Sequence, residues 1–175
     1  DVTITNVGLN PTRAGLIDVL RQMGGDIDLM DPREVGGESV ADLRVRHSAL
    51  TGIDVDPAFA PSMIDEFPIL FVAAALAQGR TTTTGLDELR VKESDRLAVM
   101  ATGLKAIGAR VTETEDGLII DGTGGDPLPG GATVAGHLDH RICMSFAVAG
   151  LVTGSPVTID DMAPVATSFP NFEAL

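Results

Sequence analysis

The chain repeats itself, and these repeats constrain its fold more than any other feature of the sequence. Residues 2–20, VTITNVGLNPTRAGLIDVL, align without gaps on residues 157–175, VTIDDMAPVATSFPNFEAL. Both segments read as a strand rich in β-branched residues followed by a helix. A middle copy runs from TTTTGL at 81–86 to LAVMATGLKAIG at 97–108, with a few extra residues at its turn. Three copies of a strand–helix pattern are therefore expected along the chain.

A second repeated pattern is a helix that leads into a strand. Residues 65–83, DEFPILFVAAALAQGRTTT, align with residues 140–158, HRICMSFAVAGLVTGSPVT, which makes Asp65 and His140 equivalent positions at two helix starts. Further strands are expected at 26–30, 42–46, 109–114 and 117–121, and a Gly/Pro-rich loop at 121–131. The fold class is therefore α/β, with three βαβαββ-like units around one core. The units are expected to be incomplete at both ends of the chain, and no linker divides it into two domains.

Composition excludes several function classes. The 175 residues are 44% hydrophobic, contain no Trp or Tyr, and carry a net charge of −13, so a basic surface for nucleic acid or anionic membrane is not expected. The longest apolar run, 67–77, is interrupted by Pro68 and is too short to cross a bilayer, and no signal peptide is present. The single cysteine, Cys143, lies in an apolar run, which predicts a buried structural residue in a reducing compartment.

The charged start of the third predicted helix conflicts with the helix dipole. Arg90 and Lys92 precede this helix and Arg96 lies in its first turn, where the positive end of the dipole disfavours cations by a few tenths of a kcal/mol or more. A bound anion would resolve this conflict, as phosphates and carboxylates do at helix starts. A surface network in which Glu93 and Asp95 neutralise the cations would also resolve it. Both interpretations stay open on this segment alone.

Two equivalent helix starts supply further groups of the same kind. His140 and Arg141 open one helix, and Asp65 opens the helix at the equivalent repeat position. Together with Glu93, Asp65 offers the carboxylates that general acid–base chemistry needs. His137 and His140 could suggest metal ligands, but no further His or Cys completes a set. The pattern therefore favours an anion site with carboxylates beside it.

Four motifs in this order, MIDEFPIL, RVKESDRL, HLDHRICMSF and ATSFPNF, closely resemble the C-terminal domain of the EPSP synthase family, and more narrowly its bacterial glyphosate-insensitive type. The resemblance runs along nearly all 175 residues. It implies an inside-out α/β barrel of βαβαββ units, forming most of the C-terminal domain of a two-domain enolpyruvyl transferase whose N-terminal domain is absent here. Helix starts of both domains would face an interdomain cleft. A cytoplasmic, monomeric full-length enzyme of the shikimate pathway is implied, without a metal or organic cofactor.

The implied reaction moves the enolpyruvyl group of phosphoenolpyruvate to the 5-hydroxyl of shikimate 3-phosphate, through a tetrahedral intermediate, and releases phosphate. By resemblance, Asp65 contacts this hydroxyl and acts as the candidate base. Glu93 shuttles the proton to and from the methylene carbon of phosphoenolpyruvate. Lys92 stabilises charge beside the shikimate oxygen and the transferring group. The isolated 175-residue chain is expected to be inactive, because half of the cleft is missing.

The resemblance also implies the carboxylate-binding residues. Arg96 and Arg141 would clamp the carboxylate of phosphoenolpyruvate, a task that suits the planar guanidinium group. His140 would hydrogen-bond near the same group and take part in proton transfer. Two positions depart from the family pattern. Thr167 stands where many members carry a lysine that meets the leaving phosphate, and Glu88 stands where others carry an amide that touches the shikimate phosphate.

Three other functions compete with this interpretation. An enolpyruvyl transferase that acts on UDP-N-acetylglucosamine shares the fold and the chemistry, but RVKESDR fits the shikimate enzyme better. RNA 3′-phosphate cyclases use related repeats, and the acidic chain argues against them. A binding module of the same fold without catalysis has no reason to keep Asp65, Lys92, Glu93 and Arg96 together at an electrostatic cost.

Overall fold

The computed structural model describes all of residues 1–175, and its first 46 residues form a three-stranded antiparallel sheet with one helix. The strands are β1 (Val2–Gly8), β2 (Asp26–Val35) and β3 (Glu38–Arg46), in the order β1-β3-β2. Helix α1 (Gly15–Gln22) connects β1 to β2. β2 and β3 are longer than the expected strands because Gly36 and Gly37, with φ of 61° and 86°, form a tight hairpin turn.

The middle of the chain contains one complete βαβαββ unit, as the repeats predict. Its first strand is reduced to two parallel bridges, Thr51 to Gln78 and Asp54 to Thr82. The other elements follow in the expected order: α3 (Phe67–Leu76), β4 (Arg80–Thr82), α4 (Arg96–Ala106), β5 (Arg110–Glu113) and β6 (Leu118–Asp121). The strands β4, β6 and β5 form an antiparallel sheet in that order.

The last 48 residues repeat the beginning of this unit. Their elements are β7 (Leu128–Gly130), β8 (Thr133–Val134), α5 (His140–Gly150), β9 (Thr153–Ser155), β10 (Thr158–Ile159), α6 (Ala163–Ser168) and the short 3₁₀ helix η4 (Phe172–Ala174). β7 pairs with β9 and β8 with β10, both in parallel. Two expectations need correction. The loop expected at 121–131 contains β7, because its backbone pairs with β9. The third copy places α6 where the first copy has a loop, and Pro170 follows the end of this helix.

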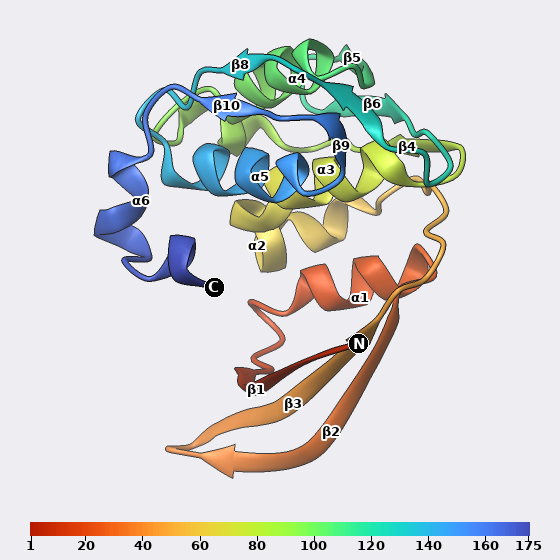
Figure 1. Ribbon diagram of the computed structural model, residues 1–175. Helices are drawn as coiled ribbons and strands as arrows, with labels where there is room; N and C mark the ends of the chain where they lie inside the picture. Colours follow the sequence, from red (N-terminus) through yellow and green to blue (C-terminus); the bar gives the residue numbers. More distant parts are fainter.

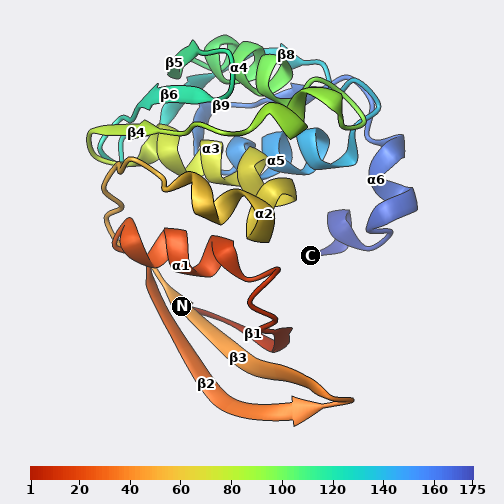
Figure 2. The same cartoon turned by 180° about the vertical axis from the view of Figure 1, so that it is seen from behind.

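Helix α3 lies side by side with α5, with α4 above the two helices and α2 (Ala60–Met63) and α1 below them in Figures 1 and 2. Seven of its ten residues are buried: Phe67, Pro68, Leu70, Phe71, Val72, Ala74 and Ala75. A helix that is apolar on all sides is stable only when it is surrounded by protein or lipid. Here α4 and α5 surround it, which agrees with the expectation of units packed around buried helices.

The segment Pro57–Leu76 is long and apolar enough, by length and composition, to cross a membrane. It is longer than the run 67–77 identified in the sequence because the helical turns η1 (Pro57–Phe59), α2 and η2 (Ile64–Glu66) precede α3 without a break. Half of its most apolar window is buried inside the domain. The central helix of a globular core passes the same test, and α3 occupies that place in this fold.

Candidate active site

The start of α4 places a buried arginine at the centre of the charged residues. Asp95 is the N-cap of α4 and accepts a hydrogen bond from the Ala98 N–H at 3.0 Å. This cap satisfies one of the unpaired N–H groups of the first turn. Arg96 is the first helical residue, and its side chain is 1% exposed. A guanidinium group at this depth needs carboxylate partners, because an unpaired buried charge is strongly unfavourable.

The innermost partner of Arg96 is Asp139, which is the N-cap of α5. Arg96 Nε donates to Asp139 Oδ2 at 2.8 Å, and Arg96 Nη2 donates to Asp139 Oδ1 at 3.3 Å. The Asp139 side chain is completely buried. Burial raises the pKa of Asp139, but the hydrogen bonds and charge of Arg96, together with Ser94 and the Arg141 N–H, lower this pKa below its ordinary value. Asp139 is therefore ionised at neutral pH and joins the starts of α4 and α5.

Three cations from separate segments converge on the carboxylate of Asp65. Arg96 Nη1 lies 3.0 Å from Asp65 Oδ1, Lys92 Nζ lies 3.6 Å from the same oxygen, and Arg141 Nη2 lies 3.7 Å from Oδ2. Asp65 belongs to η2, Lys92 caps the 3₁₀ helix η3 (Asp87–Val91), and Arg141 belongs to α5. The arrangement is a site in which two arginines and a lysine surround one carboxylate group.

These cations also change the acidity of Asp65. Partial burial raises its pKa, but the charges of Arg141, Lys92 and Arg96 outweigh this effect and lower the pKa below its ordinary value. Asp65 is consequently ionised at neutral pH and can accept a hydrogen bond from a hydroxyl group. Its side chain is 39% exposed, so solvent and small molecules can reach it.

Carboxylates on the outer side of the site complete the charge balance. Glu93 accepts a hydrogen bond from Arg96 Nη2 at 2.5 Å, and Glu66 lies 3.2 Å from Arg141 Nη1. Glu88 lies 2.5 Å from Lys92 Nζ, and this hydrogen bond raises the pKa of Lys92. The side chains of Glu93 and Glu88 are 50% and 62% exposed. Both are therefore accessible, in contrast to the buried Asp139.

A network in which carboxylates neutralise the cations, the second interpretation of the segment 90–96, explains part of the charge of this segment. Arg90 Nη1 lies 3.0 Å from Asp95 and 2.9 Å from Glu113, and the same guanidinium donates to the carbonyl groups of Thr114 and Glu115. Arg90 thus attaches the start of α4 to the β5–β6 sheet. Asp95 serves as its partner and as a helix cap. These contacts are structural, whereas Lys92 and Arg96 contact Asp65, and Glu93 contacts Arg96.

Two residues singled out in the sequence are not part of this network. His140 is half-buried as the first residue of α5, but its side chain makes no hydrogen bond or ion pair in the structure. Thr167 is exposed on α6, and its hydroxyl donates to the Pro164 carbonyl at 2.8 Å. The structure therefore brings Asp65, Lys92, Glu93, Arg96 and Arg141 together, and it gives no ligand-like contact to His140 or Thr167.

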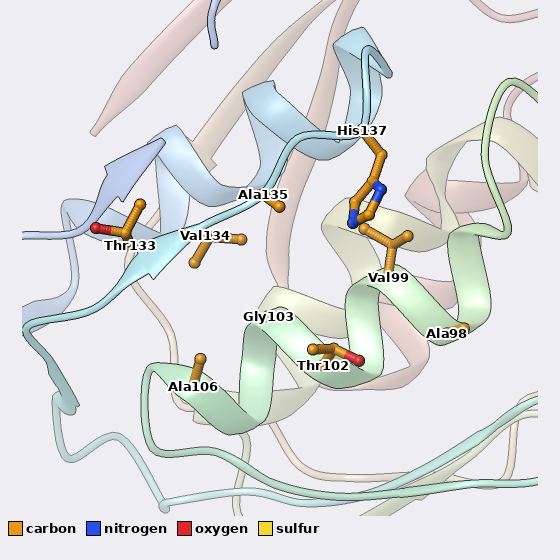
Figure 3. Close-up of a pocket in the computed structure, with 9 residues that line it drawn as sticks. All are labelled: Ala98, Val99, Thr102, Gly103, Ala106, Thr133, Val134, Ala135 and His137. Atoms are coloured by element: carbon orange, nitrogen blue, oxygen red, sulfur yellow. The ribbon is translucent and has the colours of Figure 1, made fainter. Parts of the chain in front are cut away.

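A pocket of about 470 Å³ opens beside the charged residues. It is lined by Thr12, Arg13, Pro61, Ser62, Met63, Ile64, Asp65, Glu66 and Arg141. The loop before α1 thus faces Asp65 and Arg141 across this pocket. A second pocket, of about 450 Å³, lies between α4 and β8, where Val99 and His137 face each other (Figure 3). Its lining is mostly small and apolar and contains none of the carboxylates, so we place the candidate site at the first pocket.

Two residues of the site were not assigned from the sequence. Asp139, in the motif HLDHRICMSF, was given no role, although an Asp directly before an apolar helix is a common N-cap. Glu66 is equivalent to Arg141 in the aligned repeats 65–83 and 140–158, and the structure pairs these two residues at 3.2 Å. Both signals are present in the sequence, but neither reveals that a carboxylate is buried against Arg96.

The fold and this cluster define a protein with the enolpyruvyl transferase fold. An enolpyruvyl transferase from Streptomyces tendae matches 98% of this chain and 37% of its own with a TM-score of 0.72 at 21% identity, which shows the fold. The profile of the EPSP synthase (3-phosphoshikimate 1-carboxyvinyltransferase) family matches residues 1–175. The chain therefore belongs to the EPSP synthase family.

Individual relatives agree with this assignment. The structure of EPSP synthase from Acinetobacter baumannii superposes with a TM-score of 0.94 at 51% identity, over 98% of this chain and 40% of that one. The 3-phosphoshikimate 1-carboxyvinyltransferases of Sphingopyxis alaskensis and Novosphingobium aromaticivorans are 83% and 70% identical over the whole chain. The chain spans 39% and 40% of the lengths of these two relatives.

Proposed function

We propose that this chain is part of an enzyme that transfers the enolpyruvyl group of phosphoenolpyruvate to the 5-hydroxyl of shikimate 3-phosphate and releases phosphate. The observation that carries this proposal is the convergence of Lys92, Arg96 and Arg141 on the carboxylate of Asp65. A site that already surrounds one carboxylate with three cations suits the carboxylate of phosphoenolpyruvate. The names of the relatives support the same substrates.

In this mechanism the carboxylates move protons and the cations hold charge. Asp65 accepts a hydrogen bond from the 5-hydroxyl and removes its proton as the oxygen attacks C2 of phosphoenolpyruvate. Glu93 delivers a proton to the methylene carbon, which gives a tetrahedral intermediate. Glu93 then takes a proton back from the resulting methyl group as the C–O bond to phosphate breaks, and the proton that Asp65 removed passes to the departing phosphate. Lys92 stabilises the negative charge that develops near the shikimate oxygen and the transferring group.

Arg96 and Arg141 bind the carboxylate of phosphoenolpyruvate throughout the reaction. For this, the substrate carboxylate takes the outer positions that Glu93 and Glu66 occupy in this structure. Release from Arg96 also frees Glu93 to face the methylene carbon. His140 lies at the start of α5 next to Arg141, so we propose that it hydrogen-bonds to the bound group. Thr167 cannot supply the positive charge of a lysine, and the leaving phosphate is proposed to bind to residues of the other domain.

The chain is proposed to form most of the C-terminal domain of a two-domain, monomeric enzyme of the bacterial glyphosate-insensitive type. It would act in the cytoplasm, in the biosynthesis of aromatic amino acids. The exposed cluster on one side of this domain supports a site completed by a second domain of the same polypeptide. The motif RVKESDR at 90–96 supports the insensitive type, and Glu88 and Thr167 are compatible with it.

The proposal is tested with the complete reading frame that contains these 175 residues. Phosphate release from phosphoenolpyruvate is measured with shikimate 3-phosphate and, in parallel, with UDP-N-acetylglucosamine. We expect release with the shikimate ester alone. Release with the sugar nucleotide would keep the chemistry and contradict the proposed substrate. Release with neither would contradict the proposed function and favour a binding module of the same fold.

A further inference from the structure

We propose that Asp139 is a positioning residue that fixes, from inside the protein, both arginines that bind the substrate carboxylate. The inference rests on the proposed function, because that function assigns Arg96 and Arg141 to one anion. Asp139 itself is completely buried and cannot touch a substrate. It acts only through the groups to which it is bonded.

All four contacts of Asp139 hold elements of the site. Its Oδ2 accepts hydrogen bonds from Arg96 Nε at 2.8 Å and from Ser94 Oγ at 2.9 Å. Its Oδ1 accepts from Arg96 Nη2 at 3.3 Å and from the Arg141 N–H at 3.0 Å. One carboxylate group therefore sets the side-chain orientation of Arg96 and the backbone position of Arg141.

The guanidinium group of Arg96 has an inner and an outer side. Asp139 occupies the inner edge, and both members of this pair are at most 1% exposed. Asp65 and Glu93 occupy the outer positions, and their side chains are 39% and 50% exposed. When a substrate carboxylate replaces Glu93 on the outer side, Asp65 and the inner pair stay in place. The substrate then meets an arginine that is already oriented, which lowers the entropy lost on binding.

The loop before Asp139 also depends on this carboxylate. His137 and Leu138 have φ values of 52° and 58°, in the left-handed region that side chains other than glycine seldom adopt. This turn places Asp139 at the N-cap of α5, where its side chain accepts a hydrogen bond from the Arg141 N–H. Buried bonds to Arg96 and Ser94 stabilise the turn in return.

Asp95 serves as a matched control that distinguishes a purely structural role of Asp139 from a role in positioning the two arginines. Asp95 is also a helix N-cap, and it also binds an arginine, Arg90, at 3.0 Å. That arginine faces Glu113 and the carbonyl groups of β5–β6 instead of Asp65. Asp95→Asn therefore also changes a helix cap and an ion pair with an arginine, in a more exposed position and outside the substrate site.

The first measurement compares Asp139→Asn with Asp95→Asn in the complete enzyme. Both variants are expected to lower the melting temperature. Asp139→Asn should raise KM for phosphoenolpyruvate at least about tenfold and change KM for shikimate 3-phosphate less than about twofold. Asp95→Asn should leave both KM values within about twofold of the unsubstituted enzyme. Ser94→Ala, which removes one hydrogen bond to Asp139, should shift KM for phosphoenolpyruvate in the same direction by about two- to fivefold.

A double-mutant cycle tests whether Asp139 acts through Arg96. Arg96→Lys keeps a positive charge but loses the planar fork that Asp139 binds. In the Arg96→Lys enzyme, adding Asp139→Asn should raise KM for phosphoenolpyruvate by less than about threefold, because there is little orientation left to lose. Effects that multiply in full would show that Asp139 acts independently of Arg96 and would overturn the proposal.

The remaining outcomes are also decisive. If Asp139→Asn folds and its KM for phosphoenolpyruvate is unchanged, Asp139 is structural and only the positioning role is refuted. If Asp139→Asn does not fold, Ser94→Ala decides: an unchanged KM for phosphoenolpyruvate in Ser94→Ala refutes the proposal, and a selective rise supports it. If the unsubstituted complete enzyme releases no phosphate, the proposed function fails, and the positioning role fails with it.

Discussion

At the scale of single residues, one ion pair stands out because both of its side chains are buried. Arg96 is the largest fully buried side chain, and it lies against the completely buried Asp139. Removing one partner of such a pair typically destabilises a protein by about 3–5 kcal/mol, whereas a well-packed apolar replacement of both is often neutral. A contribution to the stability of the protein is therefore a weak explanation for the presence of this pair. Orientation of the exposed edge of Arg96 is a stronger one.

Cys143 shows the opposite case of a buried group without a role in the site. Its thiol is buried and donates to the Asp161 carbonyl at 3.3 Å, and burial together with nearby carboxylates raises its pKa to about 11. At pH 8 it should therefore carry far less thiolate than a free cysteine. We expect peptide mass spectrometry after timed alkylation at pH 8 to find Cys143 unmodified in the folded enzyme and modified in denaturant. Rapid labelling without denaturant would show that the thiol is accessible.

At the scale of elements, close packing of helices explains the small residues of α4. Gly103 is buried where α4 crosses α5 and β8, and a Cβ atom at this position would lie 2.2 Å from Phe146 Cζ and 2.9 Å from Val134 Cγ1. In an ordinary helix, alanine is about 1 kcal/mol more favourable than glycine. Here the buried phenyl ring occupies the space that the methyl group would need. Overpacking should outweigh the gain in helix propensity.

We therefore expect Gly103→Ala to lower the free energy of unfolding by about 1–3 kcal/mol. Thr102→Ala is the matched control, because Thr102 is exposed on the same helix and the substitution improves helix propensity. It should leave stability unchanged within about 0.5 kcal/mol or raise it slightly. Denaturant unfolding of the complete protein measures both. A Gly103→Ala variant as stable as Thr102→Ala would mean that α4 and α5 shift apart easily.

At the scale of the whole molecule, the position of the site predicts that it does not work alone. The charged residues gather at the starts of α3, α4 and α5, and several of their side chains are 30–60% exposed. Exposed charges interact weakly with a ligand because water screens them. A second domain that closes over the cluster would remove this water and strengthen each contact.

The purified 175-residue chain should accordingly release no phosphate above background with phosphoenolpyruvate and shikimate 3-phosphate. The complete enzyme, assayed in the same buffer, is the positive control. Circular dichroism and thermal unfolding show whether the shorter chain is folded during the assay. Measurable turnover by the folded 175-residue chain would contradict the proposed two-domain site.

The periodicity of apolar residues and the positions of turn residues were sufficient to predict the order of most elements. The strands at 26–30, 42–46, 109–114 and 117–121 were found in place, since alternation and bounding turns are local signals. The hairpin at Gly36–Gly37 was missed, although paired glycines are a local turn signal. β7 and α6 could not be predicted in the same way. Each depends on a partner element that is distant in sequence, as β7 does on β9.

The sequence by itself determined which residues carry the charge of the site. Lys92, Glu93 and Arg96 occupy one helix start, and the repeats placed Asp65 and Arg141 at equivalent starts. Only the tertiary structure decided how these charges pair. It buried Arg96 against Asp139, left Glu93 exposed, and turned Arg90 toward the β5–β6 sheet. The physical reason is that residue spacing fixes the position of a side chain along its own helix, whereas burial and pairing depend on the neighbouring elements packed against that helix.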